Sequence, residues 1–169
     1  MKISAHEEYG IRCLAQVARR GGKVTIAEIA DAEHLSVENA AKILARLRTL
    51  GLVRSIRGKD GGYVMARPAD QVSVAEVLEG MTGGLFELER CVTAGEGAGC
   101  VHQSACELRP VWTTLGDLVH WFLGSITLAD VINAGEGAVQ ARVSRLAEAI
   151  AAGSGLPLTR RLPTFIERA

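Results

Sequence analysis

The sequence predicts a mostly α-helical protein: a winged helix-turn-helix with a small β-hairpin as its wing, a cysteine loop and a long dimerisation helix. Three observations carry this prediction. Apolar residues at helical spacing mark three helices in the first 51 residues, and an alternating pattern with a glycine-rich turn marks a hairpin directly after them. A broad apolar stripe then runs through residues 108–126.

The three N-terminal helices begin at residues suited to capping. The first covers about residues 4–19. Thr25 caps the second, where Glu28 three residues later completes a capping box. Ser36 caps the third, which ends at Gly51. The apolar stripe of this third helix consists of Ala40, Ile43, Leu44, Leu47 and Leu50.

A β-hairpin follows the third helix. Residues 52–56 alternate as a strand, residues 58–62 supply the turn, and residues 63–66 make the return strand. A fourth helix is predicted at residues 73–81. Beyond it glycine is frequent and no period survives up to residue 104, so we predict a loop there.

A long helix is predicted to begin at Leu108, with Pro110 in its first turn, where proline is tolerated. Its apolar face is too wide for one winged helix to cover, so we predict a two-fold symmetric homodimer. The residues expected at the interface are Val111, Trp112, Leu115, Leu118, Val119 and Phe122. A short helix over residues 127–131 and an amphipathic helix over residues 139–150 are expected to follow.

These elements divide the chain into four segments. Residues 1–81 form the winged helix-turn-helix, residues 82–107 the cysteine loop, and residues 108–133 the dimerisation helix with the short helix after it. Residues 134–169 are a C-terminal extension to which the sequence assigns no role. No run of about 18 apolar residues is present and the N-terminus lacks the apolar core of a signal peptide, so we expect a cytoplasmic protein without a membrane partner.

The net charge of zero hides an asymmetry. Residues 1–67 carry twelve Lys and Arg against seven Asp and Glu, and the remaining residues show the reverse. Within residues 34–67, seven cationic side chains face only Glu38 and Asp60. A basic half beside an acidic half favours a module that binds a polyanion.

The third helix and the wing carry the groups suited to reading DNA. On the helix these are Glu38, Asn39, Lys42 and Arg46, which match base edges and phosphates in a major groove. On the wing they are Arg54, Arg57 and Lys59, beside a glycine-rich tip slim enough for a minor groove. We predict a double-stranded operator with palindromic half-sites as the partner, with Arg57 as the main wing contact. A protein-interaction role for the winged helix is the alternative.

Three cysteines lie within sixteen residues, spaced Cys91-x8-Cys100-x5-Cys106 on a glycine-rich stretch. In a reducing compartment this pattern indicates metal binding or redox sensing rather than disulfides. Three thiolates among glycine amides suit an iron-sulfur cluster, whereas structural zinc usually shows cysteines two to four residues apart. Cys13, in the first helix, is predicted to be a buried structural thiol.

An iron-sulfur cluster usually has four protein ligands, so one ligand is missing from the loop. His102 is only two residues from Cys100, which makes simultaneous ligation awkward. Glu7 and Glu8 become candidates if a dimer brings the first helix over the loop, and we predict Glu8.

Several motifs are specific. They are Tyr9-Gly10-Ile11-Arg12, Leu44-Ala45-Arg46-Leu47-Arg48, Gly51-Leu52-Val53-Arg54-Ser55-Ile56-Arg57-Gly58 with Gly61-Gly62-Tyr63, the three cysteines, and Ser125-Ile126-Thr127-Leu128-Ala129-Asp130. With them the chain resembles the Rrf-two family of winged-helix regulators over about residues 1–133. The resemblance implies a dimer paired through the long helix, a cluster on Cys91, Cys100 and Cys106, and insertion of Arg57 into a groove.

Departures from the family pattern narrow the ligand set. Some members ligate through a histidine three residues after the last cysteine, where this chain has Arg109, so that mode is excluded. Glu8 falls where nitric-oxide sensors of the family use an acidic residue of the partner subunit. The spacing between Cys91 and Cys100 is closer to nitric-oxide and iron sensors than to cluster-assembly repressors, so we prefer a 4Fe-4S cluster over 2Fe-2S.

The sequence therefore predicts a DNA-binding transcription regulator, most simply a repressor, that senses iron, redox state or nitric oxide through the cluster. Two alternatives remain open. One is a cluster-free regulator that uses the cysteines as thiol sensors, and the other is an iron-sulfur electron carrier. An enzyme is not expected, because no nucleophile, base and orienting group assemble from the pattern.

Overall fold

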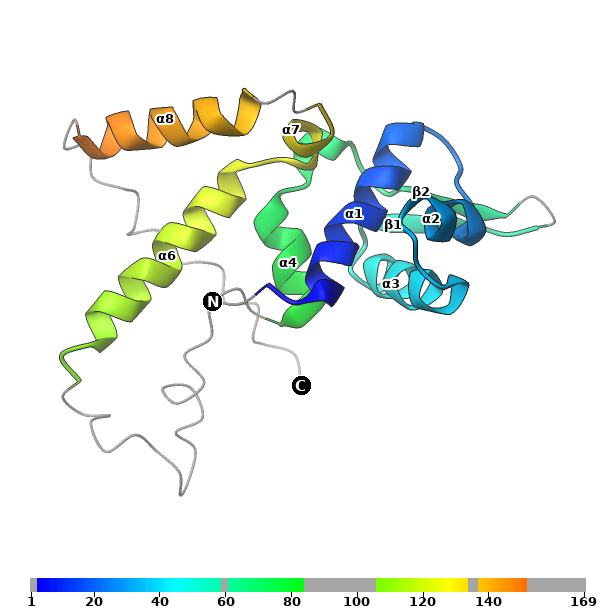
Figure 1. The fold of residues 1–169 in the computed structure, drawn as a ribbon, viewed down its shortest axis with the longest axis horizontal. Helices are drawn as coiled ribbons and strands as arrows, with labels where there is room; N and C mark the ends of the chain where they lie inside the picture. The colour runs from blue at the N-terminus through cyan, green and yellow to red at the C-terminus, as the bar shows by residue number, and fades with distance from the viewer. Residues whose placement is uncertain (1–2, 59–60, 84–105, 134–136, 152–169) are drawn as a thin grey trace, which may run out of the picture.

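The computed structural model describes residues 3–58, 61–83, 106–133 and 137–151. It confirms a mostly helical protein with one small antiparallel sheet. Figure 1 shows the elements in chain order: α1 (Ala5–Arg20), α2 (Ile26–Ala32), α3 (Val37–Thr49), β1 (Val53–Ile56), β2 (Gly62–Met65), η1 (Ala69–Gln71), α4 (Val74–Thr82), α6 (Arg109–Ser125), α7 (Leu128–Asn133) and α8 (Ala138–Ala151).

The helix caps follow local sequence chemistry. Thr25 and Glu28 form the predicted capping box at the start of α2, and the Ser36 hydroxyl accepts from the Asn39 amide at the start of α3. A further capping box joins Ser4 and Glu7 at the start of α1. These bonds satisfy amides that have no partner within their helix, which explains where each helix begins.

The wing is the hairpin β1–β2; β1 begins one residue later than predicted and ends where predicted, and β2 begins and ends one residue earlier than predicted. β1 begins at Val53 because the Leu52 amide donates to Leu47 O at 3.0 Å and so closes the end of α3. Val24, which precedes α2, adds an isolated antiparallel bridge to the hairpin and exchanges two backbone hydrogen bonds with Tyr63 at 3.0 and 2.7 Å. A Cβ on Gly62 would lie 2.6 Å from Val24 O, so this approach requires glycine.

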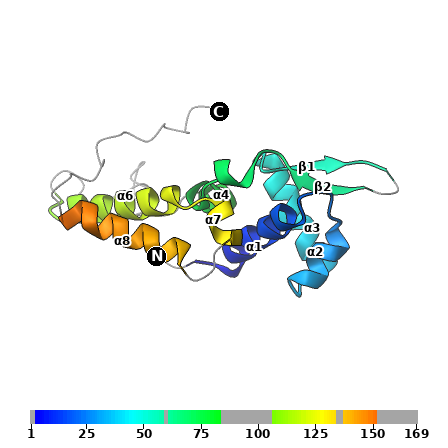
Figure 2. The same ribbon diagram turned by 90° about the horizontal axis from the view of Figure 1, so that it is seen from above.

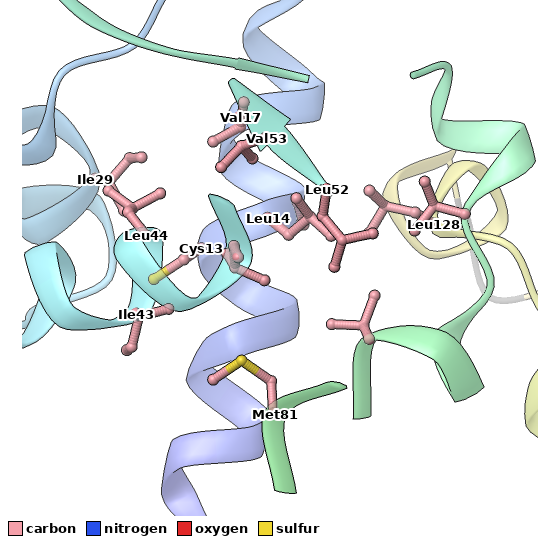
Figure 3. Close-up of a cluster of buried hydrophobic side chains, with 14 of the residues drawn as sticks. Cys13, Leu14, Val17, Ile29, Ile43, Leu44, Leu52, Val53, Met81 and Leu128 are labelled. Carbon is pink, nitrogen blue, oxygen red and sulfur yellow. The ribbon is translucent and has the colours of Figure 1, made fainter. Parts of the chain in front are cut away.

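The core is arranged around α1, which packs against both α3 and α4. Figure 3 shows Cys13 and Leu14 of α1 among side chains from α3 and the start of the wing. Leu128 of α7 is buried in the same cluster. The segment predicted to follow the dimerisation helix thus contributes to the core of the winged helix.

α6 and α8 extend away from the winged helix on the side opposite the wing (Figure 2). The residues just before α4 pair with the residues just after α6. The Val74 amide donates to Ile126 O at 2.9 Å, and the Leu128 amide donates to Val72 O at 2.8 Å. α8 is joined to α7 by an ion pair between Arg142 and Asp130 at 2.8 Å. No helix in the described ranges is long and apolar enough to cross a membrane.

Candidate functional site

The predicted recognition helix, α3, presents a polar face to solvent. Glu38, Asn39, Lys42 and Arg46 are all exposed, whereas the predicted apolar stripe faces the core. Val37, at the first position of α3, is also exposed, by 57%. Sequence patterning missed Val37, because a single valine at a helix start has no period to mark it.

The wing carries exposed cations next to α3. Arg54 and Arg57 are exposed, and Lys59 lies outside the described residues. Within those described ranges, no acidic side chain forms an ion pair with Lys42, Arg54 or Arg57. The positive charge of this face is therefore left to attract a polyanion. Gly58 has φ +119°, a conformation that an L side chain rarely adopts, so the turn into the wing tip depends on glycine.

A buried carboxylate holds the turn between α2 and α3. Glu33 is only 5% exposed and accepts hydrogen bonds from Arg12 Nε at 2.6 Å and Gln16 Nε2 at 2.5 Å. The hydrogen bond to Glu33, with its charge, raises the pKa of Arg12. Arg12 also lies 3.5 Å from Glu8 and above the ring of Tyr9. Arg12 of α1 thereby connects the predicted ligand Glu8 with the turn between α2 and α3.

Arg46 has a partner that the sequence does not predict. Its Nε and Nη2 both donate to the carbonyl oxygen of Gly80 in α4, at 2.9 and 2.6 Å. The side chain is thus engaged within the protein, although its residue is exposed.

Of the predicted cluster ligands, the structure describes Cys106 and Glu8; Cys91 and Cys100 lie outside the described residues. Cys106 is half-buried and lies just before α6. On α1, Glu8 is 63% exposed, whereas Glu7 is buried and occupied by the capping box with Ser4. The described residues contain no group of three or more His, Cys, Asp or Glu side chains placed to hold a metal.

The apolar stripe of α6 is divided between solvent and the core. Val111, Trp112 and Leu115 are exposed, together with Leu108, which was not among the predicted interface residues. Leu118 and Val119 are half-buried. Phe122 packs against the buried cluster of Val74, Leu78 and Ile126, so it is partly used within the chain.

Cys13 is fully buried, and this burial raises the pKa of its thiol to about 12. We therefore expect Cys13 to resist alkylation in the folded protein. In a variant with alanine at the three loop cysteines, iodoacetamide labelling at neutral pH should be slower than in urea by on the order of 100-fold or more. Labelling at equal rates in both states would contradict this placement.

The same thiol gives a pH-dependent contribution to stability. Because the folded pKa lies above the unfolded value, the contribution is complete below about pH 9 and is lost as the pH rises toward about 12. The free energy of unfolding of the wild type should therefore fall more steeply over this range than that of Cys13→Ala, measured by urea titration.

The fold and this surface define a class, the winged-helix transcription regulators. A family model described as "Rrf2: Iron-dependent Transcriptional regulator" matches residues 3–134. The chain therefore belongs to the Rrf2 family.

Similar proteins include both regulators and solved structures. The HTH-type transcriptional regulator IscR of Cronobacter sakazakii is 31% identical over 135 residues, covering 79% of this chain and 81% of that protein. The structure of CymR, the global cysteine regulator of B. subtilis, has a TM-score of 0.65 and 28% identity, covering 80% of this chain and 99% of that one. The T. potens IscR structure has a TM-score of 0.61 and 26% identity, covering 79% and 87%.

Proposed function

We propose that this Rrf2-family regulator is a dimeric repressor that binds a palindromic operator and senses iron, redox state or nitric oxide through an iron-sulfur cluster. The cluster ligands are Cys91, Cys100 and Cys106, with Glu8 of the partner subunit as the fourth. The observation that carries the proposal is the match to a family described as iron-dependent, over a range that contains all three cysteines.

Two observations on the described residues support the proposed cluster. Cys106 is half-buried and lies three residues before the first residue of α6, Arg109, so its sulfur is partly accessible. Glu8 is exposed on α1 and held only by a surface ion pair, so its carboxylate is available. When bound, the cluster supplies an iron centre that reacts with oxidants or nitric oxide.

Arg12 connects ligand binding to the DNA-reading surface. Its guanidinium contacts both Glu8 and Glu33, and Glu33 lies in the turn that positions α3. When Glu8 turns to the partner subunit, Arg12 retains Glu33 alone. Gain or loss of the fourth ligand thus removes or restores the Glu8 ion pair of Arg12, the residue whose guanidinium also binds Glu33 in the turn before the recognition helix.

DNA is contacted in this proposal by Glu38, Asn39 and Lys42 from α3 and by Arg54, Arg57 and Lys59 from the wing. Val37 is added as an apolar contact for a thymine methyl group, because it is exposed at the helix end that enters the groove.

Arg57→Ala should weaken specific operator binding by about 1–3 kcal/mol and relax sequence preference near the wing. Lys42→Ala, as a phosphate contact, should weaken all sequences alike and lower the salt slope by about one. Titrations at several salt concentrations, on a selected operator and a scrambled duplex, measure both effects. Salt-independent binding, or an Arg57→Ala protein equal to the wild type, would favour a protein-interaction role instead.

Anaerobic purification tests the cluster itself. Native mass spectrometry and visible absorption should show four irons and four sulfides per subunit for a 4Fe-4S cluster. Two of each would indicate the 2Fe-2S form. The proposed cluster would be contradicted if the protein purified without iron and bound its operator when its thiols were reduced but not when they were oxidised.

That last result would support the second candidate, a regulator that senses thiol chemistry directly. The similarity to CymR, named a global cysteine regulator, favours this alternative. Half-burial of Cys106 leaves it within reach of a small oxidant.

A further inference from the structure

Two consecutive residues of α4, Glu79 and Gly80, bind two different helices. Glu79 Oε1 lies 2.6 Å from Nδ1 of His120, which is on α6. The carbonyl oxygen of Gly80 accepts both hydrogen bonds from Arg46, which is on α3. We call this pair of residues the α4 junction. It joins the helix with the exposed apolar stripe to the predicted recognition helix.

The bond to Arg46 has a clear physical cause. α4 ends at Thr82, so Gly80 is in its last turn, where carbonyl groups have no amide partner within the helix. The negative end of the helix dipole also lies there. A guanidinium that places two donors on this oxygen satisfies it and neutralises that end, and charge-assisted bonds are stronger than neutral ones.

Close packing also joins Gly80 to α3, at Leu50, one turn after Arg46. A Cβ on Gly80 would lie 2.6 Å from Leu50 Cδ1, so the end of α3 lies directly against the backbone of α4. The next residue of α4, Met81, packs against α1: a Cβ on Gly10 would lie 2.9 Å from Met81 Cγ. The end of α4 is therefore held on both sides, and α3 cannot tilt without breaking these contacts.

We propose that the α4 junction sets the position of the recognition helix relative to α6, and that Arg46 and His120 are positioning residues for half-site spacing. In a two-fold symmetric dimer, the angle between α3 and the dimerisation helix decides how far apart the two recognition helices lie. The inference rests on the proposed dimeric, operator-binding function, and it gives Arg46 this role in place of the predicted DNA contact.

The test measures spacing preference with defined duplexes. An operator is selected from a random duplex library with the wild-type protein, and one base pair is then added or removed between its half-sites. We expect the wild type to bind the altered duplexes at least about tenfold more weakly. In Arg46→Gln and His120→Phe, this discrimination should fall to about threefold or less, with the salt slope unchanged.

Arg48→Gln is the matched control. Arg48 is exposed in the same last turn of α3, so its replacement removes the same charge, and it should leave the spacing preference intact. Arg46→Lys places one donor rather than two on the Gly80 carbonyl, and it should give an intermediate preference. Circular dichroism establishes that each variant is folded, and Arg46→Lys replaces Arg46→Gln in the test if the latter does not fold.

Two outcomes would overturn the inference. In the first, Arg46→Gln keeps the spacing preference and lowers the salt slope by about one, which would make Arg46 a phosphate contact. In the second, both Arg46→Gln and His120→Phe discriminate between the duplexes as the wild type does. A wild-type protein with no spacing preference at all would instead contradict the dimeric operator-binding function on which the inference depends.

Discussion

Each of the substitutions Cys91→Ala, Cys100→Ala and Cys106→Ala should abolish the proposed cluster. The iron and sulfide content should fall below about a tenth of the wild-type content. Two remaining loop thiolates and one carboxylate leave iron sites without ligands, and a thiolate contributes more to such a site than an exposed carboxylate does. Anaerobic purification followed by iron and acid-labile sulfide determination measures the effect. Operator affinity of the three variants should then equal that of the wild type stripped of iron.

Cys13→Ala is the control for these variants and should retain the cluster. Its thiol is buried in the core and stays protonated at neutral pH, because its pKa is about 12. Glu8→Ala should bind a cluster that is lost more quickly on dilution or exposure to air, since the substitution removes one of the four proposed ligands. Wild-type iron content in any of the three loop variants would show that the ligand set is wrong.

Leu115→Asp should convert the proposed dimer to a monomer. Leu115 lies in the middle of the exposed stripe of α6, and a two-fold axis brings the change into the interface twice. Losing a buried leucine and burying a carboxylate costs at least about 2 kcal/mol per subunit, so the dissociation constant should rise by on the order of 1000-fold. Light scattering and sedimentation at micromolar concentration give the mass directly.

Ile56→Asp is the comparison variant, because Ile56 is a similarly exposed apolar residue on β1 of the wing, away from α6. It should remain dimeric. Leu115→Asp should also lose most of its operator affinity, because one winged helix then contacts one half-site. A soluble wild-type monomer at micromolar concentration would refute the dimer regardless of how the variants behave.

The elements that the sequence predicted best are those decided by neighbouring residues. Thr25 with Glu28, and Ser36 with the amide of Asn39, act over three residues, so the starts of α2 and α3 follow from sequence chemistry alone. The wing was predicted to within one residue for the same reason: alternation and glycine-rich turns are local patterns.

The contacts that the sequence missed join residues far apart in the chain. Arg46 is predicted from the sequence to contact DNA, and only its position next to Gly80, 34 residues later, shows that its guanidinium binds a backbone carbonyl of the protein. No pattern in the sequence marks Glu33 as buried, yet its side chain is only 5% exposed and accepts hydrogen bonds from Arg12 and Gln16 of α1. Phe122 fell on the predicted stripe, and the return of the chain beside α4 draws it into a core cluster.

The backbone pairing of Val74 with Ile126 and of Leu128 with Val72 has a consequence for how this fold varies in length. These bonds hold the start of α4 next to the end of α6, and the contact between Glu79 and His120 joins the same two helices further along. The segment that connects α4 to α6 therefore runs between two helices that are already fixed to each other. The entropy of closing a connection between fixed ends grows only with the logarithm of its length, by about 0.6 kcal/mol for each doubling. Insertions or deletions between Gly83 and Cys106 should therefore cost little folding free energy, so that cysteine spacing is free to diverge while the winged helix keeps its shape.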